Sequence, residues 1–74
     1  MPELPLISGD ECMSVLQRAG YHVARTKGSH FRLRCPGRRP VTVPRHRDLD
    51  RATLRSILRQ AELSVEQFIE LLES

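Results

Sequence analysis

The sequence has no tryptophan, and only Tyr21, Phe31 and Phe68 carry aromatic rings. Proteins that bind single-stranded nucleic acid by base stacking need several exposed rings, so this composition argues against a stacking platform. We expect the hydrophobic core to take all three rings.

Long apolar runs and closely spaced cysteines are also missing. No stretch approaches the roughly 20 apolar residues that cross a bilayer, and the first residues lack the features of a signal peptide. Cys12 and Cys35 lack metal-ligand spacing, and two cysteines in an intracellular chain are more often small buried hydrophobes than a disulfide. We therefore expect a cytoplasmic protein with no membrane segment and no cofactor.

Carboxylates are scarce in the middle of the chain. All 12 lysines and arginines lie between Arg18 and Arg59, where only Asp48 and Asp50 oppose them, while both ends are acidic. A polyanionic partner would contact this middle region, although a merely solvated basic surface is the alternative. The lack of carboxylates and of paired histidine or cysteine spacing also disfavours a metal centre there.

Capping residues predict the start of three helices. Ser8, Asp50 and Ser64 each precede apolar residues at helical spacing. These patterns predict helices over about 9–19, from Asp50 to Ala61, and from Ser64 onward. The last helix has a wide apolar stripe, part of which is available for a partner or a second copy of the chain.

The second predicted helix also carries a basic stripe. Arg51, Arg55 and Arg59 follow one another at four-residue intervals. A solvated helix face is the default interpretation, and contact with phosphate groups is the alternative.

Between the first two helices the periodicity changes to two. Strict alternation over residues 30–34 sends His30, Arg32 and Arg34 to one face of a strand and Phe31 to the other. We expect a preceding strand from Tyr21 and a short third strand over 41–43.

The length of the first hairpin loop decides which side chains meet. A three-residue loop over 26–28, with Gly28 in the left-handed conformation, places Tyr21, Val23, Phe31 and Leu33 together inside. His22, Ala24, His30, Arg32 and Arg34 then share the outer face. The expected fold class is α+β, in one domain over residues 1–74, with a helix, three antiparallel strands and two helices packed on one face of the sheet.

Several short motifs resemble those of the HicA toxins of bacterial and archaeal toxin–antitoxin pairs. The motifs are Gly20-Tyr21, Lys27-Gly28-Ser29-His30, Val43-Pro44, and the run from Thr53 to Ala61. The resemblance implies a fold similar to double-stranded-RNA-binding domains, an mRNA-cleaving activity that inhibits translation, and neutralisation by a HicB antitoxin. It also implies that the functional histidine of the family is His30, with Gly28 and Ser29 as motif positions.

Two positions depart from the family pattern. Ala52 and Glu62 stand where the family commonly has glycine. Both lie away from His30, and Glu62 adopts a left-handed helix cap at greater cost than glycine would.

These residues predict a metal-independent endoribonuclease in which His30 is the general base. Histidine can take the proton of a 2′-hydroxyl near neutral pH, and the nearby cations would keep the imidazole neutral and stabilise the negative charge that forms on phosphorus. The expected RNA-binding residues are Lys27, Gly28, Ser29, Arg32, Arg34 and Arg45. The general acid stays open between His22, His46, His30 itself and water.

Other functions remain compatible with the sequence. The chief alternative is a non-catalytic RNA-binding module, in which His30 is an ordinary surface histidine. A structural interaction protein that uses the terminal helix is a third. If the chain is a toxin, an acidic antitoxin is expected to cover His30 and several arginines. The sequence leaves the oligomeric state open, with a monomer among the alternatives.

Overall fold

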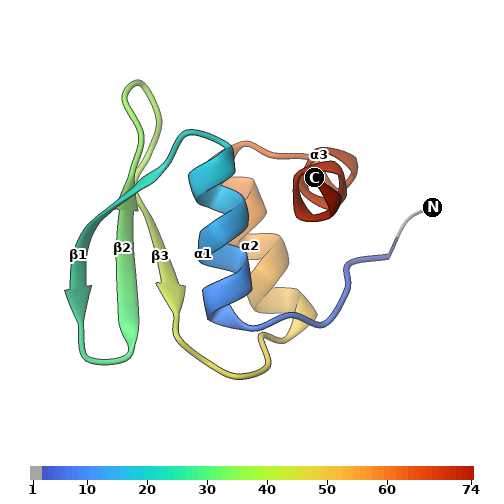
Figure 1. The fold of residues 1–74 in the computed structure, drawn as a ribbon, viewed down its shortest axis with the longest axis horizontal. Helices are drawn as coiled ribbons and strands as arrows, with labels where there is room; N and C mark the ends of the chain where they lie inside the picture. Colours follow the sequence, from blue (N-terminus) through green and yellow to red (C-terminus); the bar gives the residue numbers. More distant parts are fainter. Residues whose placement is uncertain (1–2) are drawn as a thin grey trace.

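A computed structural model describes residues 3–74, and the predicted order of elements is confirmed (Figure 1). The elements are α1 (Gly9–Arg18), β1 (His22–Lys27), β2 (His30–Arg34), β3 (Val41–Pro44), α2 (Arg51–Ala61) and α3 (Val65–Glu73). The three strands form one antiparallel sheet in the order β1-β2-β3. None of the helices in residues 3–74 has the length and apolar character that crossing a bilayer requires.

The helices lie on one side of the sheet, as predicted. α1 and α2 pack against the strands, and α3 packs on α1 on the side away from the sheet (Figure 1). No helix of residues 3–74 covers the opposite face of the sheet (Figure 1). That open face is where the outward-pointing side chains of β1 and β2 are presented.

The predicted caps begin all three helices. The Ser8 hydroxyl accepts from the Glu11 main-chain N–H at 3.1 Å, and the Glu11 carboxylate accepts from the Ser8 N–H at 3.1 Å. Ser64 forms the equivalent capping box at the start of α3, and Asp50 accepts from the Thr53 N–H at 2.7 Å. Each cap satisfies a main-chain donor that the first turn of a helix leaves free, which explains why the helix starts were predictable.

α2 ends without the glycine that commonly terminates a helix. Glu62 is the C-cap residue and has φ of 58°, a left-handed conformation that disfavours residues with a Cβ. The strain is offset by the hydrogen bond from the Leu63 N–H to the Leu58 carbonyl oxygen at 3.0 Å and by the Arg38 guanidinium, which donates to the Ala61 carbonyl oxygen at 2.7 Å. The turn therefore keeps its shape despite the departure from the family pattern.

The expected three-residue hairpin loop was wrong. Lys27 and His30 are Cα partners, so the loop is the two-residue Gly28-Ser29. The extra residue lies instead inside β1, where the register shifts between Val23 and Arg25. Ala24 is the extra residue of a β-bulge, so Val23 and Arg25 on either side of it point to opposite faces of the sheet. Val23 can therefore pack inward even though the loop has only two residues.

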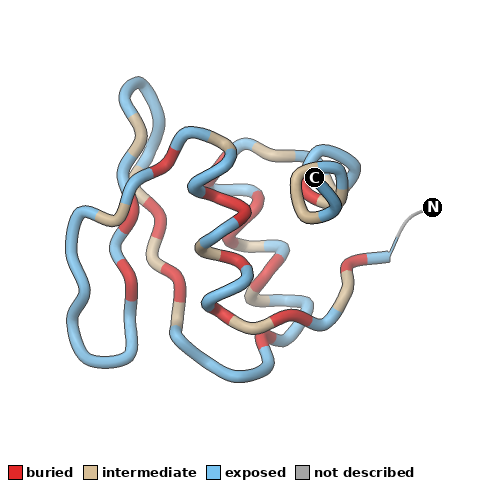
Figure 2. Tube along the Cα trace, viewed as in Figure 1, coloured by how far each residue is buried: buried red, intermediate tan, exposed pale blue. Residues whose placement is uncertain are grey.

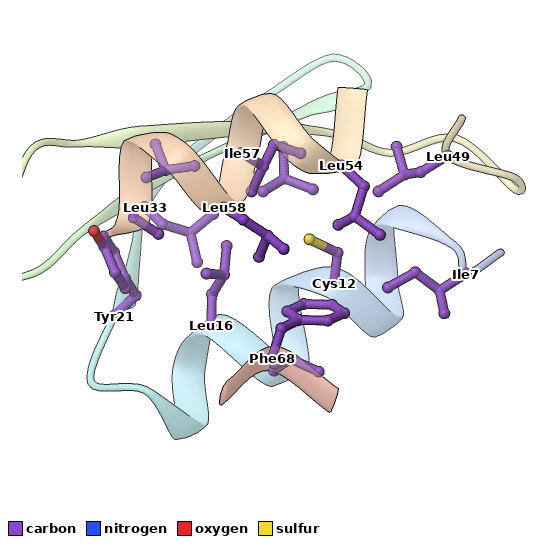
Figure 3. Packing of buried hydrophobic residues seen from close by; sticks show 14 of the residues in the cluster. Ile7, Cys12, Leu16, Tyr21, Leu33, Leu49, Leu54, Ile57, Leu58 and Phe68 are labelled. Atoms are coloured by element: carbon purple, nitrogen blue, oxygen red, sulfur yellow. The ribbon is translucent and has the colours of Figure 1, made fainter. Parts of the chain in front are cut away.

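The hydrophobic core lies between the sheet and the helices. Alternate residues of β2 and β3 are buried, whereas β1 is largely exposed (Figure 2). Phe68 of α3 is fully buried and lies beside α1, close to Cys12 (Figure 3). The three aromatic rings, Tyr21, Phe31 and Phe68, are all buried, as predicted.

The two cysteines are free thiols. Cys12 is completely buried in the core, and Cys35 is half-buried at the end of β2. Burial raises the pKa of the Cys12 thiol to about 12, because a thiolate there would lose its hydration.

Candidate functional site

The open face of the sheet is strongly basic. Cross-strand partners in an antiparallel sheet point to the same side, so the register puts Lys27 beside His30, Arg25 beside Arg32, and His22 beside Arg34. We call the surface made by Ala24, Arg25, Lys27, His30, Arg32, Arg34 and Thr42 the basic face.

The basic face is hollowed. Its residues line one open depression of about 530 Å³, and none of them is a carboxylate. The single ion pair among residues 3–74 joins Arg45 to Asp10, so the cations of the basic face have no acidic partner within the described chain. Four uncompensated positive charges around one hollow favour a polyanionic ligand.

His30 lies at the end of the hollow next to the hairpin loop. It is the first residue of β2, with Lys27 as its Cα partner on one side and Pro44 on the other. The residue is exposed and is the only histidine that lines the hollow. The imidazole is therefore open to a ligand and has an ammonium group on the neighbouring strand.

The loop before His30 has a defined shape. Gly28 has φ of 58°, as expected, and glycine at the first position of a two-residue hairpin loop is what a type II′ turn requires. The Ser29 carbonyl oxygen accepts from the Arg45 main-chain N–H at 2.6 Å. Gly28 and Ser29 thus hold the start of β2 in place, and both remain exposed at the tip.

Arg32 and Arg34 extend the basic face along β2. The Arg32 guanidinium donates to the Thr42 hydroxyl at 2.7 Å, which holds it across the neighbouring strand β3. Arg34 is exposed and lines the same hollow. The two arginines therefore lie with His30, as the alternation predicted, and Lys27 of β1 joins them.

Arg45 is placed elsewhere. Its guanidinium carbon lies 5.6 Å from the centre of the Phe31 ring, and Phe31 faces the core. Its Nε lies 3.4 Å from the Asp10 carboxylate in the first turn of α1. Of the four cationic residues expected to bind RNA, Arg45 is the one whose side chain does not join the basic face.

The other two histidines lie outside the hollow. His22 is the Cα partner of Arg34, four residues along β2 from His30, which is about 13 Å at the usual rise of a strand. His46 follows β3, and its carbonyl oxygen accepts from the Gly9 N–H at 2.8 Å. Its charge acts on Asp50, whose pKa is lowered mainly by the hydrogen bond from the Thr53 main chain and to a smaller extent by His46. Neither imidazole lines the hollow that His30 borders.

Two residues of the basic face were missed from the sequence. Arg25 points outward only because of the bulge at Ala24, and no turn residue or glycine marks that bulge in the sequence. Thr42 is half-buried on β3 and belongs to the basic face through its hydrogen bond with Arg32. Its outward direction follows from the alternation of β3, which was the available signal.

Several other arginines support the fold. Arg18 donates to the Leu71 carbonyl oxygen at 2.8 Å near the end of α3, and Arg51 donates to the Leu4 carbonyl oxygen at 2.8 Å. Arg38 donates to the Ala61 carbonyl oxygen at the end of α2, so three guanidinium groups donate hydrogen bonds to main-chain oxygens. Within the stripe on α2, Arg51 therefore has a structural contact, and Arg55 and Arg59 are exposed.

Metal-ligating side chains are dispersed. Residues 3–74 contain no group of three histidine, cysteine, aspartate or glutamate side chains close enough to hold one ion.

Comparison with known proteins identifies the family. The family described as HicA toxin of bacterial toxin-antitoxin matches residues 9–63. A solved structure of a toxin–antitoxin complex from Streptococcus pneumoniae contains a chain with 34% sequence identity and a TM-score of 0.70, and the match covers 77% of this chain and 98% of that one. No curated protein gives a significant match. The chain therefore belongs to the HicA toxin family of bacterial toxin–antitoxin systems.

Proposed function

We propose that this protein is an endoribonuclease that cleaves mRNA with His30 as general base and thereby inhibits translation. The observation that carries the proposal is the position of His30, the one histidine that lines a hollow with four cationic side chains and no carboxylate. Phosphate groups of RNA would occupy that hollow, and the imidazole lies at its edge.

The chemistry needs no metal ion. The neutral His30 imidazole takes the proton of a ribose 2′-hydroxyl, and the 2′-oxygen attacks the adjacent phosphorus. The bond from phosphorus to the 5′-oxygen breaks, which leaves a 2′,3′-cyclic phosphate on one product. The departing 5′-oxygen takes its proton from the His30 imidazolium or from water, because neither His22 nor His46 lines the hollow.

The cations around His30 have a separate role. Negative charge on the phosphoryl oxygens grows as the 2′-oxygen attacks, and positioned positive groups stabilise that charge more than they stabilise the substrate. Lys27 is nearest in the sheet, as the cross-strand partner of His30, and Arg32 is held in place by Thr42. Arg25 and Arg34 would contact neighbouring phosphates of the same strand.

A His30→Ala variant tests the assignment. We expect it to abolish cleavage of RNA and growth arrest while its affinity for RNA and its thermal unfolding stay close to those of the wild type. His46→Ala is the matched control, since it removes an exposed imidazole outside the basic face. Full toxicity of His30→Ala would overturn the proposal.

Two further measurements check the mechanism. A substrate with 2′-deoxyribose at the cleaved position would resist the enzyme, and the products would carry 2′,3′-cyclic phosphate. Cleavage that a chelator abolishes and a divalent ion restores would contradict this chemistry.

The main alternative function is RNA binding without cleavage, which the same basic face would support. It predicts that wild type and His30→Ala bind RNA equally and that neither cuts it. Measuring binding and cleavage on the same preparations separates the two functions.

The proposed protein partner is an antitoxin of the HicB type. The related chain from Streptococcus pneumoniae is part of a toxin–antitoxin complex. The basic face has no acidic partner in the described chain, so a carboxylate-rich surface would complement it. We expect the antitoxin to cover His30 and to slow chemical modification of its imidazole, and a complex that leaves His30 accessible would contradict this.

A further inference from the structure

Three consecutive residues at the end of β3, Pro44 to His46, connect the hairpin tip to the start of α1. Pro44 is the Cα partner of His30, and the Arg45 N–H donates to the Ser29 carbonyl oxygen at 2.6 Å. The His46 carbonyl oxygen accepts from the Gly9 N–H at 2.8 Å. Gly9 itself is pressed against this segment, because a Cβ there would collide with the Pro44 carbonyl oxygen.

The Arg45 side chain makes a second connection between the start of β2 and the start of α1. Its guanidinium lies over the ring of Phe31, the residue that follows His30, with its carbon 5.6 Å from the ring centre. The same group reaches the Asp10 carboxylate in α1, with Nε 3.4 Å from the oxygen. Arg45 therefore contacts the residue before His30 through its main chain and the residue after it through its side chain.

These contacts do not involve the open face of the sheet. Phe31 points into the core, on the side opposite His30, and Arg45 does not line the hollow of the basic face. A phosphate that occupied the hollow would meet Lys27, Arg32 and Arg34 rather than Arg45. The Arg45 side chain thus contacts other groups of the protein and not a ligand in the hollow.

We infer that Arg45, held by Asp10, is a positioning residue that fixes the Ser29–Phe31 segment and so aims the His30 imidazole at its substrate. This inference rests on the proposed function of His30. An exposed ion pair and an exposed cation–π contact add little to global stability, and the side chains of Arg45 and Asp10 are each 57% exposed. The main effect of these contacts is therefore to orient the Ser29–Phe31 segment.

The inference predicts a separation of catalysis from binding. Misplacing a catalytic group by about 1 Å can cost on the order of 100-fold in rate. For Arg45→Gln we expect kcat for RNA cleavage to fall by about 10-fold to 100-fold, with KM changed by less than about twofold. The slope of log KM against log salt concentration should stay at the wild-type value, because no phosphate contact is lost.

Two related variants sharpen the test. Arg45→Lys keeps a cation that can reach Asp10 and lie over Phe31, so it should recover most of the lost kcat. Asp10→Asn removes the ion pair alone and should lower kcat less than Arg45→Gln. The double variant should be no worse than Arg45→Gln, since both residues act through one contact.

Arg47→Gln is the matched control. It removes one positive charge from the same loop, and Arg47 is exposed, lies outside the basic face and forms no ion pair within residues 3–74. We expect its kcat to equal that of the wild type.

A second readout does not depend on activity. Amide hydrogen exchange at Ser29, His30 and Phe31 should become faster in Arg45→Gln and stay unchanged in Arg47→Gln, while exchange in α2 stays the same in both. Unchanged exchange at the tip would overturn the inference. A lower salt slope with raised KM would also overturn it, because Arg45 would then be an RNA contact.

Failure of the proposed function gives a different result. It would appear as absence of cleavage by the wild-type chain, or as full cleavage by His30→Ala. Failure of the role of Arg45 would leave His30→Ala inactive and Arg45→Gln as active as the wild type.

Discussion

Lys27 and His30 are Cα partners across the β1–β2 hairpin, with only Gly28 and Ser29 between them in the chain. An ammonium group and an imidazole therefore leave the same face of the sheet at neighbouring positions. Lys27 is the cation best placed to contact a phosphate beside His30, because the other cations of the basic face lie further along the strands.

Replacing Lys27 by glutamine should weaken both binding and catalysis. We expect KM to rise, kcat to fall, and the slope of log KM against log salt concentration to decrease by about 0.7 to 0.9, the effect of one lost phosphate contact. Arg55→Gln is the control, since Arg55 is exposed on α2 behind the sheet. An equal loss of salt slope in both variants would show that RNA also crosses α2.

Gly28 and Gly37 form a matched pair for a second prediction. Both have positive φ, 58° and 80°, and a Cβ at either would meet no atom within 4 Å. Substitution by alanine should therefore cost each variant about 1 to 2 kcal/mol in the free energy of unfolding. Only Gly28→Ala should also reduce cleavage, because Gly37 lies in the turn at the other end of β2. Denaturant unfolding and initial rates check this, and equal activity of the two variants would contradict it.

Glu62→Gly should make the protein more stable. Its φ of 58° lies in the left-handed region, where glycine has no Cβ penalty. We expect a gain of about 0.5 to 1 kcal/mol in the free energy of unfolding, measured by denaturant titration. Gln60→Gly, two residues earlier in α2, should have the opposite sign, with a loss of about 0.5 to 1 kcal/mol. A destabilised Glu62→Gly variant would show that the carboxylate has a stabilising contact.

The buried Cys12 thiol predicts a loss of stability in alkali. Its pKa is raised from the ordinary 9.0 to about 12 by burial, so the unfolded chain releases this proton at a lower pH than the folded chain does. The contribution of this thiol to stability is complete below pH 9 and decreases as the pH rises from 9 towards 12. Over that range the free energy of unfolding of the wild type should fall more steeply than that of Cys12→Ala. Parallel curves would contradict the assignment.

The helices were predictable because their signals are local. The hydroxyl and carboxylate caps at Ser8, Asp50 and Ser64 act on main-chain groups within the same turn, and each predicted start agrees with the structure. The alternation of β2 likewise placed His30, Arg32 and Arg34 together, because burial of Phe31 and Leu33 decides the orientation of that strand.

The rest of the site depends on contacts between distant segments. The bulge at Ala24 is a compromise between a tight loop and the burial of Val23, and nothing in the local sequence records it. Arg45 was expected to bind RNA because it is a cation near the basic strands. Its actual position depends on Asp10, 35 positions earlier in the sequence, and on the packing of α1 against the end of β3.

The bulge at Ala24 also makes the spacing of β1 as important as its composition. Removing this one residue would leave the tight loop intact and restore plain alternation in β1, because Val23 and Arg25 already pair with consecutive residues of β2, Leu33 and Arg32. Val23 would stay inward, and Arg25 and Lys27 would stay outward. A deletion of Ala24 is therefore expected to keep both the core and the basic face. Removal of a paired residue such as Thr26 would instead absorb the bulge and turn Arg25 towards the core.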